Sequence, residues 1–332
     1  MATRYESVHQ SPKGPGDERP TASQIIKDEQ LGGKWSDKTI LITGCSSGIG
    51  VETAKALFET SATLYLTARN LNKAKSALGS SMIKSERVHL LECDLNSLAS
   101  VRKCADTFLA QHNRLNVLIA NAGIMACPEG RTADGFELQF GTNHLAHFLL
   151  IQLLLPTMVK SSTPEFQSRV VVLSSLAHRM GGVDLDNLNL EKPYHAWAAY
   201  AQSKTANIYT ATELDRRYAS QGVRAYAVHP GLIFTGLMTN VDEEMLAHWN
   251  TDPNVRNATK NAEQGAATTV WAATAQALEG QGGRYLEECQ ISKPAPPDAP
   301  EYKAGHAPHA YDAEKEKGLW EKSLEMVKPF MA

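Results

Sequence analysis

Residues Lys38 to Leu57, with the sequence KTILITGCSSGIGVETAKAL, decide the fold that we expect for the chain. A short β-branched and apolar run predicts a strand over Thr39–Thr43, and apolar residues at helical spacing predict a helix that begins directly after three glycines. A helix that starts at such a turn directs unpaired N–H groups and the positive end of its dipole at one spot. That spot suits a phosphate group, and glycine allows a close approach to the backbone. A plain strand-to-helix turn that needs glycine for its dihedral angles is the alternative.

Composition narrows the class of protein. The 332 residues suffice for one large α/β domain or two small ones, and a hydrophobic content of 42% supports a sizeable core. The net charge of -3 provides no basic field for nucleic acid or an anionic membrane. The 5 cysteines form no CxxC pair and indicate reduced thiols. We find neither a signal peptide nor a run of about 18 apolar residues, so we expect a cytoplasmic protein without a membrane span.

Strands and helices alternate along the chain. This pattern predicts an α/β fold with a doubly wound, Rossmann-type parallel sheet of about seven strands, helices on both faces and a single domain. Long helices are predicted over 136–160, where Pro156 should kink or shorten the helix, and over 197–220, with further helices over 262–277 and 312–326. The predicted strands cover residues 39–43, 62–67, 88–93, 115–120, 169–174, 223–228 and 283–286.

The ends of the chain differ in composition from its middle. Residues 1–35 are polar, and we expect them to be mostly disordered, with a short helix near 23–30. The Rossmann domain should span 36–290 and carry a substrate lid over about 232–261. Residues 291–332 form a C-terminal extension. The apolar residues of the lid fit ordinary packing as well as they fit a substrate wall.

The glycine-rich turn is one of an ordered set of motifs, each at the end of a predicted strand or on a predicted helix. Together they resemble the short-chain dehydrogenase/reductase family over residues 38–286. Three stretches, at 143–148, 174–178 and 227–231, look most like the retinol-dehydrogenase-like branch and similar fungal reductases of specialised metabolism. The motifs are Thr43 with Gly44-x-x-x-Gly48-x-Gly50, Asp94, Asn121-Ala122-Gly123, Asn143, Ser175, Tyr200-x-x-x-Lys204 and Pro230-Gly231.

Tyr200 and Lys204 stand four residues apart, so their side chains share one face of the predicted helix. A lysine cation beside a tyrosine stabilises the phenolate, and we expect it to lower the tyrosine pKa towards neutrality. Tyr200 can then exchange a proton with a substrate oxygen. Alone, this spacing is common by chance and fits a solvated helix face; the accompanying motifs favour catalysis.

Two further residues complete the expected catalytic set. Ser175 ends the fifth predicted strand, where its hydroxyl can bond the reacting oxygen. Ser174 is the competing candidate, because only one of two successive strand side chains points into the site. The family spacing to Tyr200 favours Ser175, and the resemblance implies that Asn143 anchors a water in a proton relay through Lys204.

The region after the second predicted strand bears on cofactor choice. An NAD-selective site places Asp or Glu there, whereas this chain has Thr67-Ala68-Arg69-Asn70. Arg69 suits a 2′-phosphate, with hydrogen bonds from Ser46 or Ser47, so we expect NADP(H) rather than NAD(H). An arginine that points into water is the alternative. The resemblance assigns cofactor contacts to Gly44, Ser46, Ser47, Gly48, Ile49, Gly50, Arg69, Asp94, Leu95, Asn121, Ala122, Gly123, Tyr200, Lys204, Pro230, Gly231, Ile233 and Thr235.

These residues point to an oxidoreductase that interconverts a small-molecule ketone or aldehyde with an alcohol. An oxidative dehydrogenase of a lipophilic, retinoid-like or sterol-like alcohol is one alternative, and a catalytically silent dinucleotide-binding protein is another. The histidines near the motifs lack metal-ligand spacing, so we expect no metal. The helices predicted over 136–160 and 197–220 are candidates for pairing in a homodimer or homotetramer.

Overall fold

A computed structural model describes residues 4–191, 193–300 and 302–331. Its centre is a sheet with strand order β3-β2-β1-β4-β5-β6-β7-β8, parallel except for the last pair. The order reverses between β1 and β4, which is the switch point at which ligands bind in such folds. The strands are β1 (Thr39–Thr43), β2 (Thr63–Ala68), β3 (Val88–Glu92), β4 (Val117–Ala120), β5 (Ser168–Leu173), β6 (Val223–Val228), β7 (Arg284–Glu287) and β8 (Gln290–Ile291).

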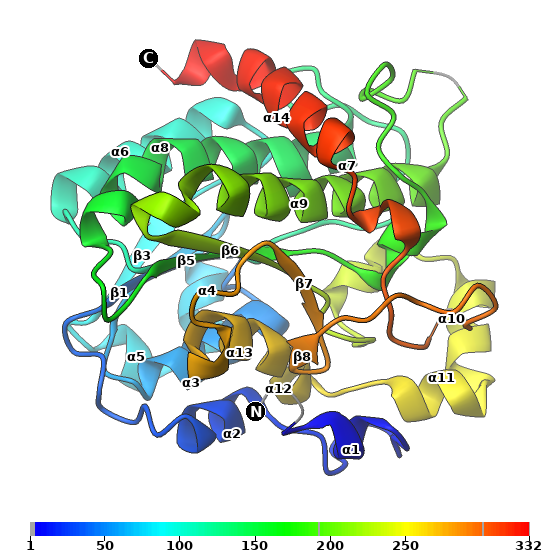
Figure 1. The fold of residues 1–332 in the computed structure, drawn as a ribbon, viewed down its shortest axis with the longest axis horizontal. Helices are drawn as coiled ribbons and strands as arrows, with labels where there is room; N and C mark the ends of the chain where they lie inside the picture. Colours follow the sequence, from blue (N-terminus) through cyan, green and yellow to red (C-terminus); the bar gives the residue numbers. More distant parts are fainter. Residues whose placement is uncertain (1–3, 192, 301, 332) are drawn as a thin grey trace.

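Helices cover both faces of the sheet, as predicted (Figure 1). One face carries α6, α8, α9 and α14, and the other carries α2, α3 and α13. The α-helices are α1 (Glu6–His9), α2 (Ala22–Asp28), α3 (Ile49–Phe58), α4 (Leu71–Leu78), α5 (Ser80–Ile83), α6 (Leu98–Gln111), α7 (Leu138–Phe140), α8 (Ala146–Ser161), α9 (Ala196–Tyr218), α10 (Glu243–Thr251), α11 (Pro253–Ala258), α12 (Ala262–Gly265), α13 (Ala267–Thr274) and α14 (Ala313–Val327).

The sheet has eight strands, one more than the seven predicted. The additional strand, β8, has two residues and folds back on β7 through Glu288 and Cys289. Both turn residues have positive φ, +53° and +55°, which is the geometry of a tight hairpin turn. Such turns normally carry Asn or Gly, so the sequence Glu-Cys gave no hairpin signal.

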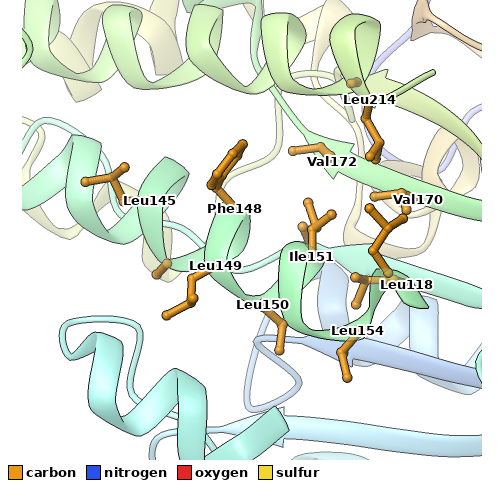
Figure 2. Packing of buried hydrophobic residues seen from close by; sticks show 14 of the residues in the cluster. Leu118, Leu145, Phe148, Leu149, Leu150, Ile151, Leu154, Val170, Val172 and Leu214 are labelled. Carbon is orange, nitrogen blue, oxygen red and sulfur yellow. The ribbon is translucent and has the colours of Figure 1, made fainter. Parts of the chain in front are cut away.

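The helix predicted over 136–160 is built in three parts. It begins as α7, continues as a π-helical turn over Gly141–Leu145 and ends as α8, which passes through Pro156 to Ser161. Proline therefore does not end this helix. Leu145, Phe148 and Ile151 pack with β4, β5 and α9 in the apolar layer that Figure 2 shows.

The segment Leu138–Ser161 has the length and composition of a membrane-crossing helix, although the sequence holds no unbroken run of about 18 apolar residues. Its mean hydropathy is 1.2, and 72% of its apolar window is buried inside the protein. Burial of that extent is typical of the core helix of a globular domain, and α8 packs beside α6 on one face of the sheet.

Residues 4–35 form an ordered segment packed on the domain, contrary to the prediction of disorder. The predicted short helix is α2, whose Ile25 and Ile26 are buried against α3 and α13. Arg19 is 4% exposed and donates hydrogen bonds to the carbonyl oxygens of Ala258 (2.8 Å) and Thr259 (2.6 Å). This residue thereby ties the N-terminal segment to the end of α11.

The C-terminal extension ends in α14, close to the helix predicted over 312–326. It packs along α9 and α8, where the Trp320 and Phe148 rings meet edge to face with centroids 5.0 Å apart. Ser323 Oγ lies 2.8 Å from His144 Nε2. The helix therefore covers a face that pairing of α8 and α9 across a two-fold axis would need.

Candidate functional site

The glycine-rich turn between β1 and α3 has almost no room for side chains. A Cβ on Gly50 would lie 2.4 Å from the Gly44 carbonyl oxygen, and a Cβ on Gly44 would lie 2.8 Å from the Ala122 Cβ. Gly44 and Gly48 have φ of +77° and +62°, which glycine adopts readily. The turn therefore brings backbone N–H groups to the start of α3, as binding of a dinucleotide phosphate requires.

Hydrogen bonds fasten this turn to the end of β4. Thr43 Oγ1 accepts bonds from the backbone N–H groups of Asn121 (2.9 Å) and Ala122 (3.0 Å). The Asn121 side-chain amide donates to the Thr43 carbonyl oxygen at 2.7 Å, while its Oδ1 is buried with no partner among the described residues. The two strand ends at the switch point thus form one rigid edge with a spare acceptor, which fits a cofactor that crosses this edge.

Tyr200 lies on the inner face of α9 and is 3% exposed. Burial raises the pKa of Tyr200 to about 12, and a hydrogen bond with the Ser175 side chain acts in the opposite direction. The Lys204 ammonium lies 5.6 Å from the centre of the Tyr200 ring. The spacing predicted a lowered tyrosine pKa, and the structure shows a raised one because removing the phenolate from water outweighs the stabilising contacts.

The Lys204 side chain is buried to about the same extent as that of Tyr200. Burial lowers its pKa to about 8, and its Nζ donates to the Leu173 carbonyl oxygen at 3.1 Å. Nζ would lie 3.4 Å from a Cβ on Gly123, which places this glycine directly beside the ammonium. The end of β5, the Asn121–Gly123 segment and α9 therefore converge on this one ammonium group.

The two serines after β5 point in different directions. Ser174 Oγ is buried and donates to the Lys204 carbonyl oxygen at 2.7 Å. Ser175 Oγ faces the Tyr200 hydroxyl and accepts from the Ala177 N–H at 3.1 Å. The geometry therefore places Ser175 at the site and gives Ser174 a structural contact.

Asn143 lies in the π-helical turn, which the sequence pattern did not reveal. Its Oδ1 accepts from the Ile124 N–H at 2.9 Å, and its amide donates to the Ile124 carbonyl oxygen at 2.9 Å and to Ser203 Oγ at 3.0 Å. π-turns often occur at functional sites, because the extra residue redirects a side chain. Ser203 was missed, although its position three residues after Tyr200 places it on the same helix face.

His147 also supports the site, although the sequence offered it only as a core or loop histidine. Its Nε2 lies 2.9 Å from Thr43 Oγ1, and its Nδ1 lies 3.0 Å from the Asn143 carbonyl oxygen. Burial lowers its pKa to about 4, so the ring is neutral at pH 7. Among the residues that the structure describes, no group of three or more His, Cys, Asp or Glu side chains could hold a metal ion.

The remaining cofactor candidates surround the turn. Arg69 is exposed directly after β2, Ser47 is exposed and Ser46 is half-buried in the turn. Asp94, after β3, accepts from the Asn96 N–H at 3.1 Å, and Leu95 beside it is buried. These positions lie at the carboxyl ends of β1, β2 and β3, where the adenosine part of a dinucleotide binds in doubly wound folds.

The segment after β6 closes over the glycine-rich turn. A Cβ on Gly48 would lie 3.6 Å from Thr235 Cγ2, and the side chains of Ile233 and Ile49 both pack against Gly265. Pro230 and Gly231 precede this segment, and Gly231 has φ of +109°. The segment after β6 therefore lies next to the glycine-rich turn and the start of α3.

An apolar cluster forms one wall beside Tyr200. Its buried members are Met125, Ala126, Tyr200 and Val241, and Trp197 packs on it with its ring centroid 6.1 Å from those of Tyr200 and Trp249. The structure thus packs the expected lid segment against the start of α9. Met125, Ala126 and Val241 were not predicted, since their role depends on contacts between distant segments. The partly buried residues of the wall are Ala177, Trp197, Met238, Met245, Leu246 and Trp249.

Comparison with known proteins agrees with this geometry. The family profile for short chain dehydrogenases matches residues 38–246. The short-chain dehydrogenase/reductase prx1 of Penicillium roqueforti is 48% identical over 324 residues, which are 98% of this chain and 95% of that protein. Human retinol dehydrogenase 12 is 37% identical over 292 residues, 87% of this chain and 86% of that protein.

A solved structure also matches. The crystal structure of an uncharacterised protein from Mycobacterium paratuberculosis superposes with a TM-score of 0.66 at 34% identity and covers 88% of this chain and 93% of its own. Fold, motif positions and sequence identity along nearly the whole length lead to one assignment. The chain belongs to the short-chain dehydrogenase/reductase family, in the branch that contains retinol dehydrogenases and related fungal oxidoreductases.

Proposed function

We propose that the protein is an NADP(H)-dependent oxidoreductase that interconverts a ketone or aldehyde with an alcohol, with Tyr200 as proton donor and acceptor. The observation that carries the proposal is the meeting of Tyr200, Ser175 and Lys204 beside the rigid edge formed by Thr43 and Asn121. When bound, the nicotinamide supplies or accepts the hydride at the substrate carbon. The protein supplies orientation and the route for the proton.

The roles of the side chains follow from their donors and acceptors. In reduction, the Tyr200 O–H gives its proton to the substrate oxygen as the hydride reaches the carbon and the C=O π electrons move to that oxygen. The Ser175 hydroxyl donates to the same oxygen as negative charge develops there. The Lys204 ammonium stabilises the phenolate that remains, and Asn143 holds the Ile124 backbone beside the site.

The apolar wall beside Tyr200 supports a substrate with an apolar body. Trp197 and Trp249 lie edge to face at its rim, and such surfaces bind flat or aliphatic groups without hydrogen bonds. The identity to retinol dehydrogenase 12 favours the second candidate, oxidation of a lipophilic alcohol. The proposed preference for NADP(H) favours reduction, and assays in both directions with matched alcohol and ketone pairs separate the two.

Replacement of Tyr200 tests the proton transfer. We expect Tyr200→Phe to lower kcat at least about 10²-fold and to leave NADPH affinity nearly unchanged, because the hydroxyl serves the substrate oxygen. Turnover and cofactor fluorescence measure the two effects. Tyr209→Phe is the matched control, since it removes another hydroxyl on α9 that bonds the His309 carbonyl oxygen at 2.8 Å. Preserved turnover in Tyr200→Phe contradicts the role, and so does a loss of activity that loss of NADPH binding accounts for. Tight NADPH binding without turnover of any carbonyl by the native protein favours a silent dinucleotide-binding protein.

Replacement of Arg69 tests the cofactor preference. Arg69→Asp should lower the ratio of NADPH to NADH efficiency at least about 10-fold, because a charged hydrogen bond to a 2′-phosphate contributes about 1.5–3 kcal/mol. The control Lys75→Asp makes the same charge change on the exposed side of α4. An unchanged NADPH/NADH ratio in Arg69→Asp removes Arg69 from the cofactor site.

A further inference from the structure

A cavity with a volume of about 230 Å³ lies where the N-terminal and C-terminal segments of the chain meet the expected lid segment. Its walls come from the N-terminal segment after α1, from residues 229–232 after β6, from α11 and Lys260, and from Glu288 and residues 302–304. Figure 1 shows α1 and α11 side by side at this corner of the molecule. Through Leu176 and Gly231 the cavity borders the candidate catalytic residue Ser175 and the candidate nicotinamide segment.

Lys260 is the most unusual residue of this cavity. Its side chain is 5% exposed, yet among the described parts of the chain its ammonium has no hydrogen-bond or ion-pair partner. Its stem packs on Gly231, where a Cβ would meet Lys260 Cδ at 2.9 Å. Burial lowers the pKa of Lys260, although the nearby carboxyl groups of Glu287 and Glu288 act in the opposite direction without forming an ion pair with it. A buried charge of this kind normally has a partner.

His229 offers a second donor. Its Nδ1 accepts from the Leu176 N–H at 3.2 Å, and burial lowers its pKa to about 3. The neutral ring therefore carries its proton on Nε2. That N–H has no acceptor among the residues described. Both Lys260 and His229 line the cavity, so two donors without a partner among the described residues belong to one chamber.

The charges of the lining select the kind of ligand. Arg19 is already engaged by the Asp17 carboxylate at 2.8 Å and by backbone carbonyl oxygens. Of the other ionised groups, Lys260 and Lys303 are cationic and Glu288 is anionic, which leaves one positive charge in excess. A volume of about 230 Å³ is smaller than a typical drug-sized pocket. Size and charge together match a small monoanion.

We propose that this cavity binds the carboxylate group of a small organic acid, held by the Lys260 ammonium and the His229 Nε2–H. Binding of the carboxylate does not depend on the function proposed above. The acid is either the carbonyl substrate itself, since the cavity borders Ser175 through Leu176, or a separate effector.

Acetate is the probe for the binding step. At constant ionic strength and pH 7, acetate should raise the Tm of the native protein in a saturable way, whereas neutral acetamide should not. Lys260→Met keeps the length of the stem and should abolish the acetate shift, while Lys84→Met, an exposed lysine after α5, should retain it. Glu288→Gln removes the one negative charge and should tighten acetate binding several-fold.

Two results overturn the proposal. One is the absence of any acetate-specific shift in the native protein, and the other is an equal shift in Lys260→Met. Both can be read by calorimetry on each folded variant, so a change in the stability of Lys260→Met does not obscure them. NADPH affinity, measured separately, reports on the proposed oxidoreductase site, and its loss would leave the acetate result standing.

Kinetics distinguish the two sources of the carboxylate. If the acid is the substrate, acetate raises KM for a keto acid without changing kcat, and Lys260→Met raises KM for the keto acid more than for its amide. If the acid is an effector, acetate changes kcat equally for the keto acid and the amide, and Lys260→Met abolishes this change. Either pattern upholds carboxylate binding at Lys260, because both require the ammonium.

Discussion

Ser174 and Ser175 are adjacent in the chain, but their side chains have different expected roles, one structural and one in the reaction. Ser174 Oγ bonds the backbone of α9, and Ser175 Oγ faces the Tyr200 hydroxyl. We expect Ser175→Ala to lower kcat about 10²–10³-fold with little loss of stability, because a donor to the developing charge is removed. Ser174→Ala should instead cost about 1–2 kcal/mol of unfolding free energy and leave most of kcat. Turnover and denaturant unfolding of the two variants check this prediction. A large loss of kcat in Ser174→Ala, with little loss in Ser175→Ala, would instead place Ser174 at the reacting oxygen.

At the residue scale, the sequence predicts which side chains lie together better than it predicts how deeply they are buried. The spacing of Tyr200 and Lys204 places both on one helix face, which the structure confirms. It did not predict that burial raises the pKa of Tyr200 and lowers that of Lys204, because burial depends on the sheet and loops around them. For the same reason the sequence did not reveal Met125 or Ser203 as neighbours of the site.

At the scale of elements, the hairpin of β7 and β8 carries a pH response. Burial raises the pKa of Glu287 to about 7, although Ser292 donates a hydrogen bond to it at 2.5 Å. The folded state therefore holds more protons than the unfolded state between pH 4.5 and about 7, and stability falls as pH rises through this window. The loss from this group amounts to about 3 kcal/mol.

Glu287→Gln should remove this pH response, because the amide does not ionise. Relative to the variant, the native protein should lose about 3 kcal/mol of unfolding free energy between pH 4.5 and 8, measured by denaturant unfolding. Glu314→Gln, on the exposed side of α14, is the matched control and should track the native curve. Parallel curves for Glu287→Gln and the native protein would show that Glu287 does not titrate in this window.

Strands and helices with a clear hydrophobic pattern were predictable from the sequence. Elements that depend on contacts between distant segments were not. The strands β1, β4, β5 and β6 are apolar runs buried on both faces, and their predicted ranges agree with the structure to within two residues. The π-turn at Asn143 and the hairpin that forms β8 carry no distinctive residues. At Pro156 the local signal was misleading: the sequence predicted a kinked or shortened helix, but α8 continues to Ser161 because its packing outweighs the local cost of proline.

At the scale of the molecule, α14 determines which surface remains for assembly. It covers α8 and α9 through Trp320 and Ser323, and Glu316 pairs with Arg216 of α9. We therefore expect a monomer of 36.2 kDa by light scattering. Trp320→Glu should expose Phe148 and cause self-association, whereas Lys317→Glu, on the exposed side, should not. A native dimer that persists in Trp320→Glu would locate the contact elsewhere.

The Arg19 guanidinium has a consequence for anyone who shortens this chain for crystallography or biotechnology. Composition invites a cut near residue 35, where the polar leader ends, and that cut removes the donor that satisfies the carbonyl oxygens of Ala258 and Thr259. Those oxygens lie near the end of the expected lid segment, and the same cut removes α2, whose Ile25 and Ile26 are buried against α3 and α13. We therefore expect the shortened chain to lose stability as well as the anchoring of the lid segment, which denaturant unfolding measures. The N-terminal segment is thus an integral part of the fold that holds the end of the lid segment, rather than a removable extension.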